Sequence, residues 1–283
     1  MSRGDWKFFI PEDISDKQKD SISYLCEYYN VSREEAVELG TRKTGRKPNL
    51  PGSKTCKPVK DMTHEDIWST KNRDSVKDIF DFYVDQGAWS TFRQTIRHQE
   101  LVGLHKSIWN GISRDGIHIV EYGCGVAPFS TTFLEELNGI SLDISLSDVE
   151  KSEHFIFGNW KLNKMIEDLS LENVNVHMKP IKHNELPKYD REIDFLIMFE
   201  VLEHVPSPIS ALSNLTEQMA DRALYLENFK KHERKGNVDL GPDLSSAAEE
   251  REKYYDFLEE KFILAQGPSP RVGPNDTRLW IKR

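Results

Sequence analysis

The sequence has few of the features that mark membrane proteins and disulfide-stabilised proteins. Its 283 residues contain only three cysteines, Cys26, Cys56 and Cys124, with no C-x-x-C pair. This number and spacing indicate neither a disulfide framework nor a cysteine zinc site. No apolar run approaches the roughly 20 residues that a membrane helix needs, and the first residues lack the apolar core of a signal peptide. We therefore expect a cytoplasmic protein with reduced thiols and no membrane contact.

The net charge of −9 hides one basic stretch. Residues 39–60 contain seven Lys or Arg and no acid, and three prolines interrupt them. Such a run is typical of a solvated linker and less often of a nucleic-acid patch. Two short amphipathic helices are predicted before it, between Asp20 and Gly40, because Ser32 is a good helix start and Gly40 a good stop. We expect residues 1–60 to form a small helical module followed by a basic linker.

Helical periodicity returns over residues 63–111, and from Ile117 onward strands and helices alternate. Alternation of this kind predicts an α/β fold whose parallel sheet carries helices on both faces. The last two strands are joined by a Pro/Gly loop rather than a helix, so they must be antiparallel. The apolar content of 37% is enough for a sizeable core. The seven expected strands are residues 117–122, 140–143, 174–178, 193–199, 223–227, 262–265 and 278–282.

A glycine turn follows the first of these strands. Gly123 and Gly125 leave no Cβ between the backbone and whatever lies against it, and a helix is expected to begin near Ser130. A dinucleotide fingerprint would place a third glycine at Pro128, which has no N–H to offer a diphosphate. Asp143, twenty residues after Gly123, has the spacing of an acid that binds the two hydroxyls of a ribose. The turn therefore favours a nucleoside ligand without a phosphate.

The stretch resembles motif I of the Rossmann-like S-adenosylmethionine methyltransferases, an apolar run followed by an acid, one residue and G-x-G-x-G. Glu121, Gly123 and Gly125 match this motif, and Ala127 replaces the last glycine. The resemblance implies a methyltransferase fold over residues 112–283 with S-adenosylmethionine as cofactor and a seven-stranded, mostly parallel sheet with an antiparallel closing hairpin. In such a site the glycines permit close approach, Asp143 holds the ribose, and Glu121 orients the methionine end.

A second run, Glu200-Val-Leu-Glu-His-Val-Pro206, follows the expected fourth strand. It is similar to the E-V-L-E-H-V-P run of small-molecule methyltransferases, including the ubiquinone-pathway O-methyltransferases. This resemblance implies O-methylation of a small hydroxylated acceptor, such as a sugar or a phenol. Phe199 then belongs to the cofactor site, and Glu200 and His204 are the candidate catalytic residues, with His204 as general base because its pKa lies near working pH.

Helices ahead of motif I cover the cofactor in methyltransferases that this chain resembles, and they supply much of the acceptor site. We therefore assign residues 61–111 as a helical cap. Four of its side chains are candidates to line that site: Trp89, Arg93, Arg97 and His98. An equally good interpretation is that the aromatic side chains belong to the core and the arginines pair with surface acids.

The second run also allows a metal hypothesis. If the chain turns helical after Phe199, Glu200, Glu203 and His204 lie on one face of one turn. With His232 they would form most of a site for Mg²⁺, Mn²⁺ or Zn²⁺, which would lower the pKa of an acceptor hydroxyl. The small-RNA 3′-end ribose methyltransferases share such a set, so a metal-dependent RNA ribose 2′-O-methyltransferase is the alternative function. Without a metal, these side chains would cap the helix or touch the methionine tail.

Two further classes are less well supported by the sequence. Base methylation requires either an Asn/Asp-Pro-Pro-aromatic turn after the fourth strand or a nucleophilic cysteine after proline, and neither is present. A non-catalytic protein that binds only cofactor or a partner stays open, because fold alone never proves activity. The acceptor itself has no signature in the sequence.

Overall fold

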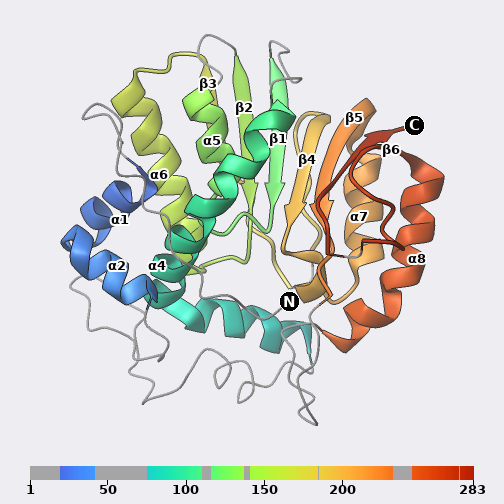
Figure 1. Cartoon of the computed structure of the whole chain (residues 1–283), viewed down its shortest axis with the longest axis horizontal. Helices are drawn as coiled ribbons and strands as arrows, with labels where there is room; N and C mark the ends of the chain where they lie inside the picture. Colours follow the sequence, from blue (N-terminus) through green and yellow to red (C-terminus); the bar gives the residue numbers. More distant parts are fainter. Residues whose placement is uncertain are drawn as a thin grey trace.

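A computed structural model describes residues 20–41, 75–109, 116–136, 141–183, 185–231, 244–273 and 275–283. They form a seven-stranded sheet in the order β3-β2-β1-β4-β5-β7-β6 (Figure 1). The first five strands run parallel, and β7 pairs antiparallel with both β5 and β6. The predicted fold class is confirmed. The strands are β1 (Ile117–Tyr122), β2 (Leu142–Ser147), β3 (Val174–Met178), β4 (Ile193–Phe199), β5 (Met219–Asn228), β6 (Phe262–Gln266) and β7 (Arg278–Lys282).

Helices cover both faces of the sheet. Because successive side chains of a strand point to opposite faces, Ile119 and Phe195 pack against α5 (Pro128–Glu136) and α6 (Glu153–Leu169). Val120 and Leu196, one residue further along each strand, pack on the other side with α7 (Pro208–Glu217) and α8 (Ser245–Lys261). The central strands are therefore buried on both faces, as a parallel sheet requires.

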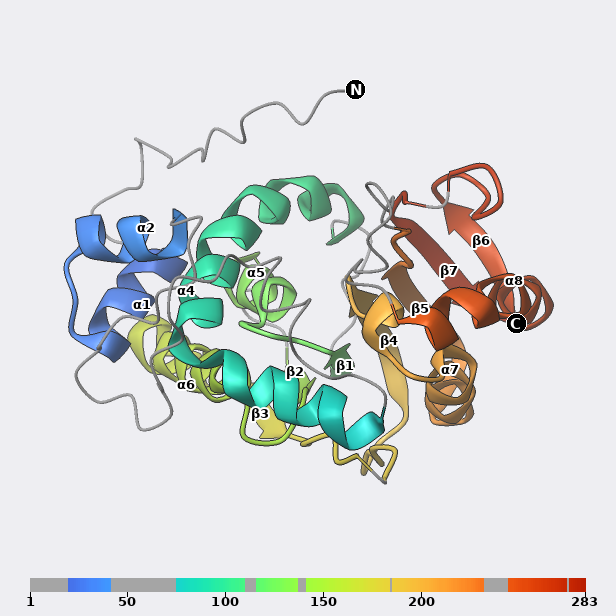
Figure 2. The same ribbon diagram turned by 90° about the horizontal axis from the view of Figure 1, so that it is seen from below.

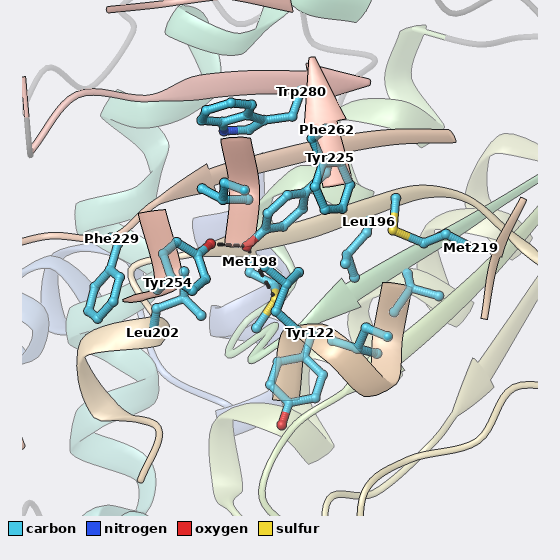
Figure 3. Close-up of a cluster of buried hydrophobic side chains, with 14 of the residues drawn as sticks. Tyr122, Leu196, Met198, Leu202, Met219, Tyr225, Phe229, Tyr254, Phe262 and Trp280 are labelled. Carbon is cyan, nitrogen blue, oxygen red and sulfur yellow. Dashed lines mark hydrogen bonds between the residues drawn. The ribbon is translucent and has the colours of Figure 1, made fainter. Parts of the chain in front are cut away.

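Two tyrosine hydroxyl groups in the core beneath α7 and α8 are paired with each other. Tyr225 of β5 and Tyr254 of α8 are joined by a 2.6 Å hydrogen bond between their hydroxyl groups (Figure 3). The Tyr225 hydroxyl also lies 3.5 Å from the sulfur of Met198. A buried phenol hydroxyl left without a partner would be destabilising, so this pair fixes α8 against β5.

Helix α4 (Val76–Trp109) is divided by Gly87, whose φ of +60° and ψ of −157° are not helical. Figure 1 shows its first part below the carboxyl ends of the parallel strands and its second part rising along α5. A residue with a Cβ would be strained in this conformation. The glycine therefore allows one helix to cross the sheet edge and then turn up its face.

Helices α1 (Ser21–Tyr29) and α2 (Arg33–Thr41) pack on α4 and α6 (Figures 1 and 2). A Cβ on Gly40 would lie 2.3 Å from Cδ1 of Ile96 and 2.8 Å from the carbonyl oxygen of Phe92. The two predicted short helices are confirmed, and they share a hydrophobic core with the rest of the chain. The buried members of that core are Ile22, Leu25, Tyr29, Ala36, Leu39, Ala88, Phe92, Ile96, Val126 and Phe157.

The basic stretch after residue 41 and the proposed boundary at residue 60 lie outside the described residues. None of the helices in the described part combines the length and apolar character needed to span a bilayer.

Two differences from the prediction affect the site. The second strand begins at Leu142 and continues to Ser147, so the expected strand 140–143 is wrong. After Phe199 the chain does not enter an α-helix but makes a short 3₁₀ turn, η1 (Leu202–His204). Both differences change the site, because each moves charged side chains relative to the carboxyl edge of the sheet.

Candidate functional site

The turn after β1 has a left-handed backbone at every second residue. Gly123 has a φ of +67°, Gly125 of +52° and Ala127 of +53°. A Cβ on Gly123 would lie 2.4 Å from Val201, and one on Gly125 would lie 2.5 Å from Oε1 of Gln94. Conformation therefore favours glycine at both positions, and the overlap with Val201 adds a steric requirement at Gly123, whereas the end of the Gln94 side chain could shift away from Gly125. Ala127 adopts the same backbone conformation, so it replaces the third glycine at the cost of some strain.

Asp148 is the acid that lies beside this turn, and the sequence analysis missed it. It directly follows β2, and its Oδ2 accepts a 2.6 Å hydrogen bond from the backbone N–H of Gly125. Its Oδ1 accepts a 2.6 Å bond from the N–H of Val149 and lies 3.6 Å from Nε2 of His154. Asp148 thus occupies the place at the end of the second strand where the βαβ arrangement brings an acid to a ribose.

The prediction for Asp143 is wrong. It is the second residue of β2 and pairs in register with His118, near the start of β1. Its carboxylate contacts Arg191 and accepts a 2.9 Å hydrogen bond from Asn175. Asp143 lies five residues before Asp148. At about 3.3 Å per residue along a strand, it is therefore about 16 Å from the sheet edge that carries the turn. The alternation of Leu142, Ile144 and Leu146 was the available signal that the strand continues to Ser147.

Glu121 is buried below the turn, where both of its oxygens contact the start of α5. Its Oε2 accepts hydrogen bonds from the N–H and the hydroxyl of Ser130, at 2.9 and 2.5 Å, and Oε1 accepts a 3.4 Å bond from the N–H of Phe129. These N–H groups have no partner within the helix itself. Burial raises the pKa of Glu121 to about 7, although these hydrogen bonds act in the opposite direction. Its predicted role at the methionine end remains a prediction.

Glu200 bridges two cations at the end of β4. Its Oε2 lies 2.5 Å from the guanidinium of Arg97 on α4, and its Oε1 contacts the ammonium of Lys230, just past β5. Burial alone would raise its pKa, but the charges of Arg97 and Lys230 outweigh burial, and the pKa is lowered to about 2. Glu200 has a left-handed φ of +55°, and its N–H donates a 2.6 Å hydrogen bond to Oδ1 of Asn228.

The metal hypothesis is not supported by this geometry. The helical face that it required does not form, because the left-handed Glu200 and the 3₁₀ turn replace the expected α-helix. Glu203 is fully buried, and His232 lies outside the described residues. Among the residues that the structure describes, no group of three or more His, Cys, Asp or Glu side chains is arranged to hold a metal ion.

His204 lies at the end of η1 and is partly buried. Its ring is 6.4 Å from the ring of Tyr83 on α4, and Tyr83 is also 6.4 Å from the ring of His154. The first part of α4 therefore places Tyr83 between His154, which lies near the end of β2, and His204, which lies near the end of β4. Phe199, the last residue of β4, packs edge-on against Phe129 of α5 with 5.0 Å between ring centroids. Its cofactor role remains a prediction.

The second part of α4 turns a polar face toward the sheet edge and an apolar face toward α1 and α2. Ser90 donates a 2.7 Å hydrogen bond to Gln86, and Gln94 donates a 3.3 Å bond to Ser90. Gln94 then lies over Gly125, and Arg97 reaches Glu200. Residues three and four apart share one face of a helix, so this polar face is continuous from Ser90 to His98.

Of the four predicted cap residues, the structure brings Arg97 and His98 to the site. Burial and the charge of Arg97 lower the pKa of His98 to about 3, which keeps its ring neutral. Trp89 is buried in the helix layer, and the guanidinium of Arg93 lies 5.6 Å from the centroid of its ring. Trp89 is therefore a core residue, whereas Arg97 contacts Glu200 at the site.

One family of known proteins matches this chain. A family model described as a methyltransferase domain matches residues 94–257, which is more than half of the chain. No curated protein sequence matches the chain.

Several solved structures are similar at 16% identity or less. An S-adenosylmethionine-dependent methyltransferase from Aquifex aeolicus is 16% identical, with a TM-score of 0.43, over 66% of this chain and 96% of that one. The CurJ carbon methyltransferase is 13% identical, with a TM-score of 0.45, over 73% and 66%. A Galdieria sulphuraria protein assigned as a sarcosine dimethylglycine methyltransferase is 16% identical, with a TM-score of 0.35, over 51% and 48%, so the chain spans about half of its length.

The family model covers the polar end of α4, the glycine turn, β4 with η1, and most of α8. The matched residues 94–257 include the glycine turn, Asp148, Glu200 and His204. The chain therefore belongs to the methyltransferase domain family.

Proposed function

We propose that the chain transfers a methyl group from S-adenosylmethionine to a hydroxyl oxygen of a small acceptor. The observation that carries this proposal is the contact between Val201 and the glycine turn. A Cβ on Gly123 would lie 2.4 Å from Val201, so the segment from Glu200 to His204 meets the turn at Val201. A base on that segment is therefore next to the place where the methyl donor is held.

The residues around the turn fit the cofactor. The carboxylate of Asp148 suits the two hydroxyls of a ribose, and the left-handed turn lets backbone approach a ligand closely. Phe199 and Phe129 supply an apolar surface at the end of β4. When bound, S-adenosylmethionine supplies a methyl group that is electrophilic because it is attached to a sulfonium. The contribution of the chain is mainly to hold donor and acceptor in line.

His204 is the candidate group that accepts the proton of the acceptor hydroxyl. Its imidazole is partly buried beside Tyr83, and an ordinary histidine titrates near neutral pH. Glu200 carries a full negative charge at that pH, because its pKa is about 2, but Arg97 and Lys230 engage it. We assign Glu200 to holding these two cations and His204 to moving the proton.

A methyl-transfer assay with labelled cofactor and a panel of hydroxylated metabolites tests this function. His204→Ala should lower kcat by roughly 10²- to 10⁴-fold, the usual contribution of a general base, while the affinity for S-adenosylhomocysteine stays within twofold. His183→Ala is the control, because His183 is exposed and lies beside Phe80. Cofactor binding without turnover of any acceptor would instead favour the non-catalytic alternative.

A further inference from the structure

Arg97 and Lys230 form a pair of cations around one carboxylate. Together with the ionised Glu200 they carry a net charge of +1, and neither cation is fully covered: the side chain of Arg97 is 50% exposed and that of Lys230 is 26% exposed. A guanidinium has five N–H donors, and a single carboxylate engages at most two of them in a fork. The pair can therefore bind a second anionic group beside Glu200.

Both cations are held on rigid supports. The guanidinium of Arg251 donates to the carbonyl oxygens of Phe229, at 2.5 Å, and Lys230, at 2.7 Å, and lies 3.9 Å from the centroid of the Phe229 ring. Arg97 belongs to the part of α4 that packs against α1 and α2 through Phe92 and Ile96. Groups fixed in this way lose little entropy when they bind a ligand.

The position of the pair in the sheet identifies which ligand meets it. Along the carboxyl edge, Asp148 follows β2, the glycine turn follows β1, Glu200 follows β4 and Lys230 lies just past β5. Neighbouring strands are about 4.8 Å apart, so this row spans about 14 Å from the ribose-binding acid to Lys230. With the nucleoside of the cofactor over β2 and β1, the methyl acceptor lies over β4 and β5.

We propose that Arg97 and Lys230 bind a carboxylate or phosphate group of the methyl acceptor, so that the acceptor is a small hydroxylated acid. This inference rests on the proposed function. It narrows the acceptor from any sugar or phenol to one that carries an acidic group.

The test uses the full chain with S-adenosylhomocysteine bound, titrated with acids and their neutral amides. The pairs are 4-hydroxybenzoate and 4-hydroxybenzamide, glucuronate and glucuronamide, and lactate and lactamide, with inorganic phosphate as a further probe. At least one acid should bind tenfold or more tightly than its amide, because charge-assisted hydrogen bonds to Arg and Lys are lost in the amide. Equal binding of acid and amide in every pair would overturn the proposal.

Variants locate the binding of the acid. Arg97→Gln and Lys230→Gln should each reduce acid binding about tenfold and leave amide binding unchanged. Lys231→Gln is the matched control, because it removes the same charge from an exposed side chain one residue away. Arg97→Lys should retain part of the preference for the acid, and a thermal melt of each variant shows whether it is folded. Acid binding that survives both Gln substitutions would exclude this pair as the binding site.

The cofactor also carries a carboxylate, which Arg97 and Lys230 could bind instead of an acceptor acid. A second pair of probes distinguishes these two ligands. S-adenosylhomocysteine has the amino-acid group and 5′-methylthioadenosine lacks it. The Gln substitutions should leave the affinities for both unchanged. Weaker binding of S-adenosylhomocysteine alone would assign Arg97 and Lys230 to the cofactor and overturn the proposal. A wild-type chain that binds neither nucleoside would contradict the proposed function itself. The acids and amides would then be titrated against the chain without a nucleoside, so that a failure of the proposed function is distinguished from a failure of this inference.

Discussion

The N–H of Gly125 donates a 2.6 Å hydrogen bond to the carboxylate of Asp148. This bond joins the turn after β1 to the end of β2. It holds the carboxylate of Asp148 against the backbone of the turn. Asp148 is also close to His154, the second residue of α6. The conformation of the turn and the position of the acid are therefore set together.

Replacing Asp148 should weaken cofactor binding far more than replacing Asp143. Asp148→Ala removes both the partner of Gly125 and the acceptor proposed for the ribose hydroxyls, so we expect at least a tenfold loss of S-adenosylhomocysteine affinity by calorimetry. Asp143→Ala changes an acid at the opposite edge of the sheet and should leave the affinity within twofold. The reverse result would restore the assignment to Asp143.

Gly123 should tolerate no side chain, and Gly116 provides the control. Both have a φ near +70°, but a Cβ on Gly116 would meet nothing within 4 Å, whereas one on Gly123 would overlap Val201. Gly116→Ala should therefore lose about 1–2 kcal/mol of unfolding free energy, the cost of the left-handed backbone. Gly123→Ala should lose more, and adding Val201→Ala should recover part of the difference in urea unfolding. Equal losses for the two glycines would show that overlap with Val201 is unimportant.

The stability contributed by Glu121 should depend on pH. Burial raises its folded pKa from 4.5 to about 7, so the folded chain binds the proton more tightly than the unfolded chain. This stabilisation is fully present below pH 4.5 and is lost as the pH rises through 7. Glu121→Gln keeps an oxygen for Ser130 but does not titrate. The unfolding free energy of Glu121→Gln, relative to that of the wild type, should therefore rise by on the order of 3 kcal/mol between pH 4.5 and pH 8. A constant difference across this range would contradict the raised pKa.

Gly40 should be required for α2 to dock on α4. Gly40→Val would place a side chain against Ile96 and the carbonyl of Phe92, so we expect about 1–3 kcal/mol of destabilisation from overpacking. Because α4 carries Arg97 and Gln94, ligand affinity should fall as well. Glu34→Val adds the same side chain to an exposed position of α2 and should change neither quantity substantially. Unfolding in urea and calorimetry with S-adenosylhomocysteine measure both effects.

Much of the fold follows from local patterns. The observed β3 and β4 have the predicted bounds, and the closing pair β6 and β7 is antiparallel because its short Pro/Gly loop permits no other connection. The error in β2 had a local cause. Asp143 and Asp148 lie in the same short stretch, and the spacing rule alone does not say which of them marks the end of the strand.

The site followed less completely from the sequence. The glycine turn and the position of His204 after β4 were predicted, but the set of Glu200, Glu203 and His204 was based on a helix that does not form. The bridge from Glu200 to Arg97 joins residues about a hundred positions apart, and the one to Lys230 joins residues thirty positions apart. Such pairs depend on how α4 and β5 are placed against β4, which periodicity does not encode.

The sequence by itself determined the alternating architecture, the turn at Gly123 and Gly125 and the family motif, because each depends on residues that are close together along the chain. Only the tertiary structure decided that Asp148 rather than Asp143 adjoins the turn, that α4 presents its polar face to the sheet edge, and that Glu200 is held by two cations. The physical reason is that strand register and helix orientation are set by packing across the whole domain. A charge finds its partner only after that packing is complete.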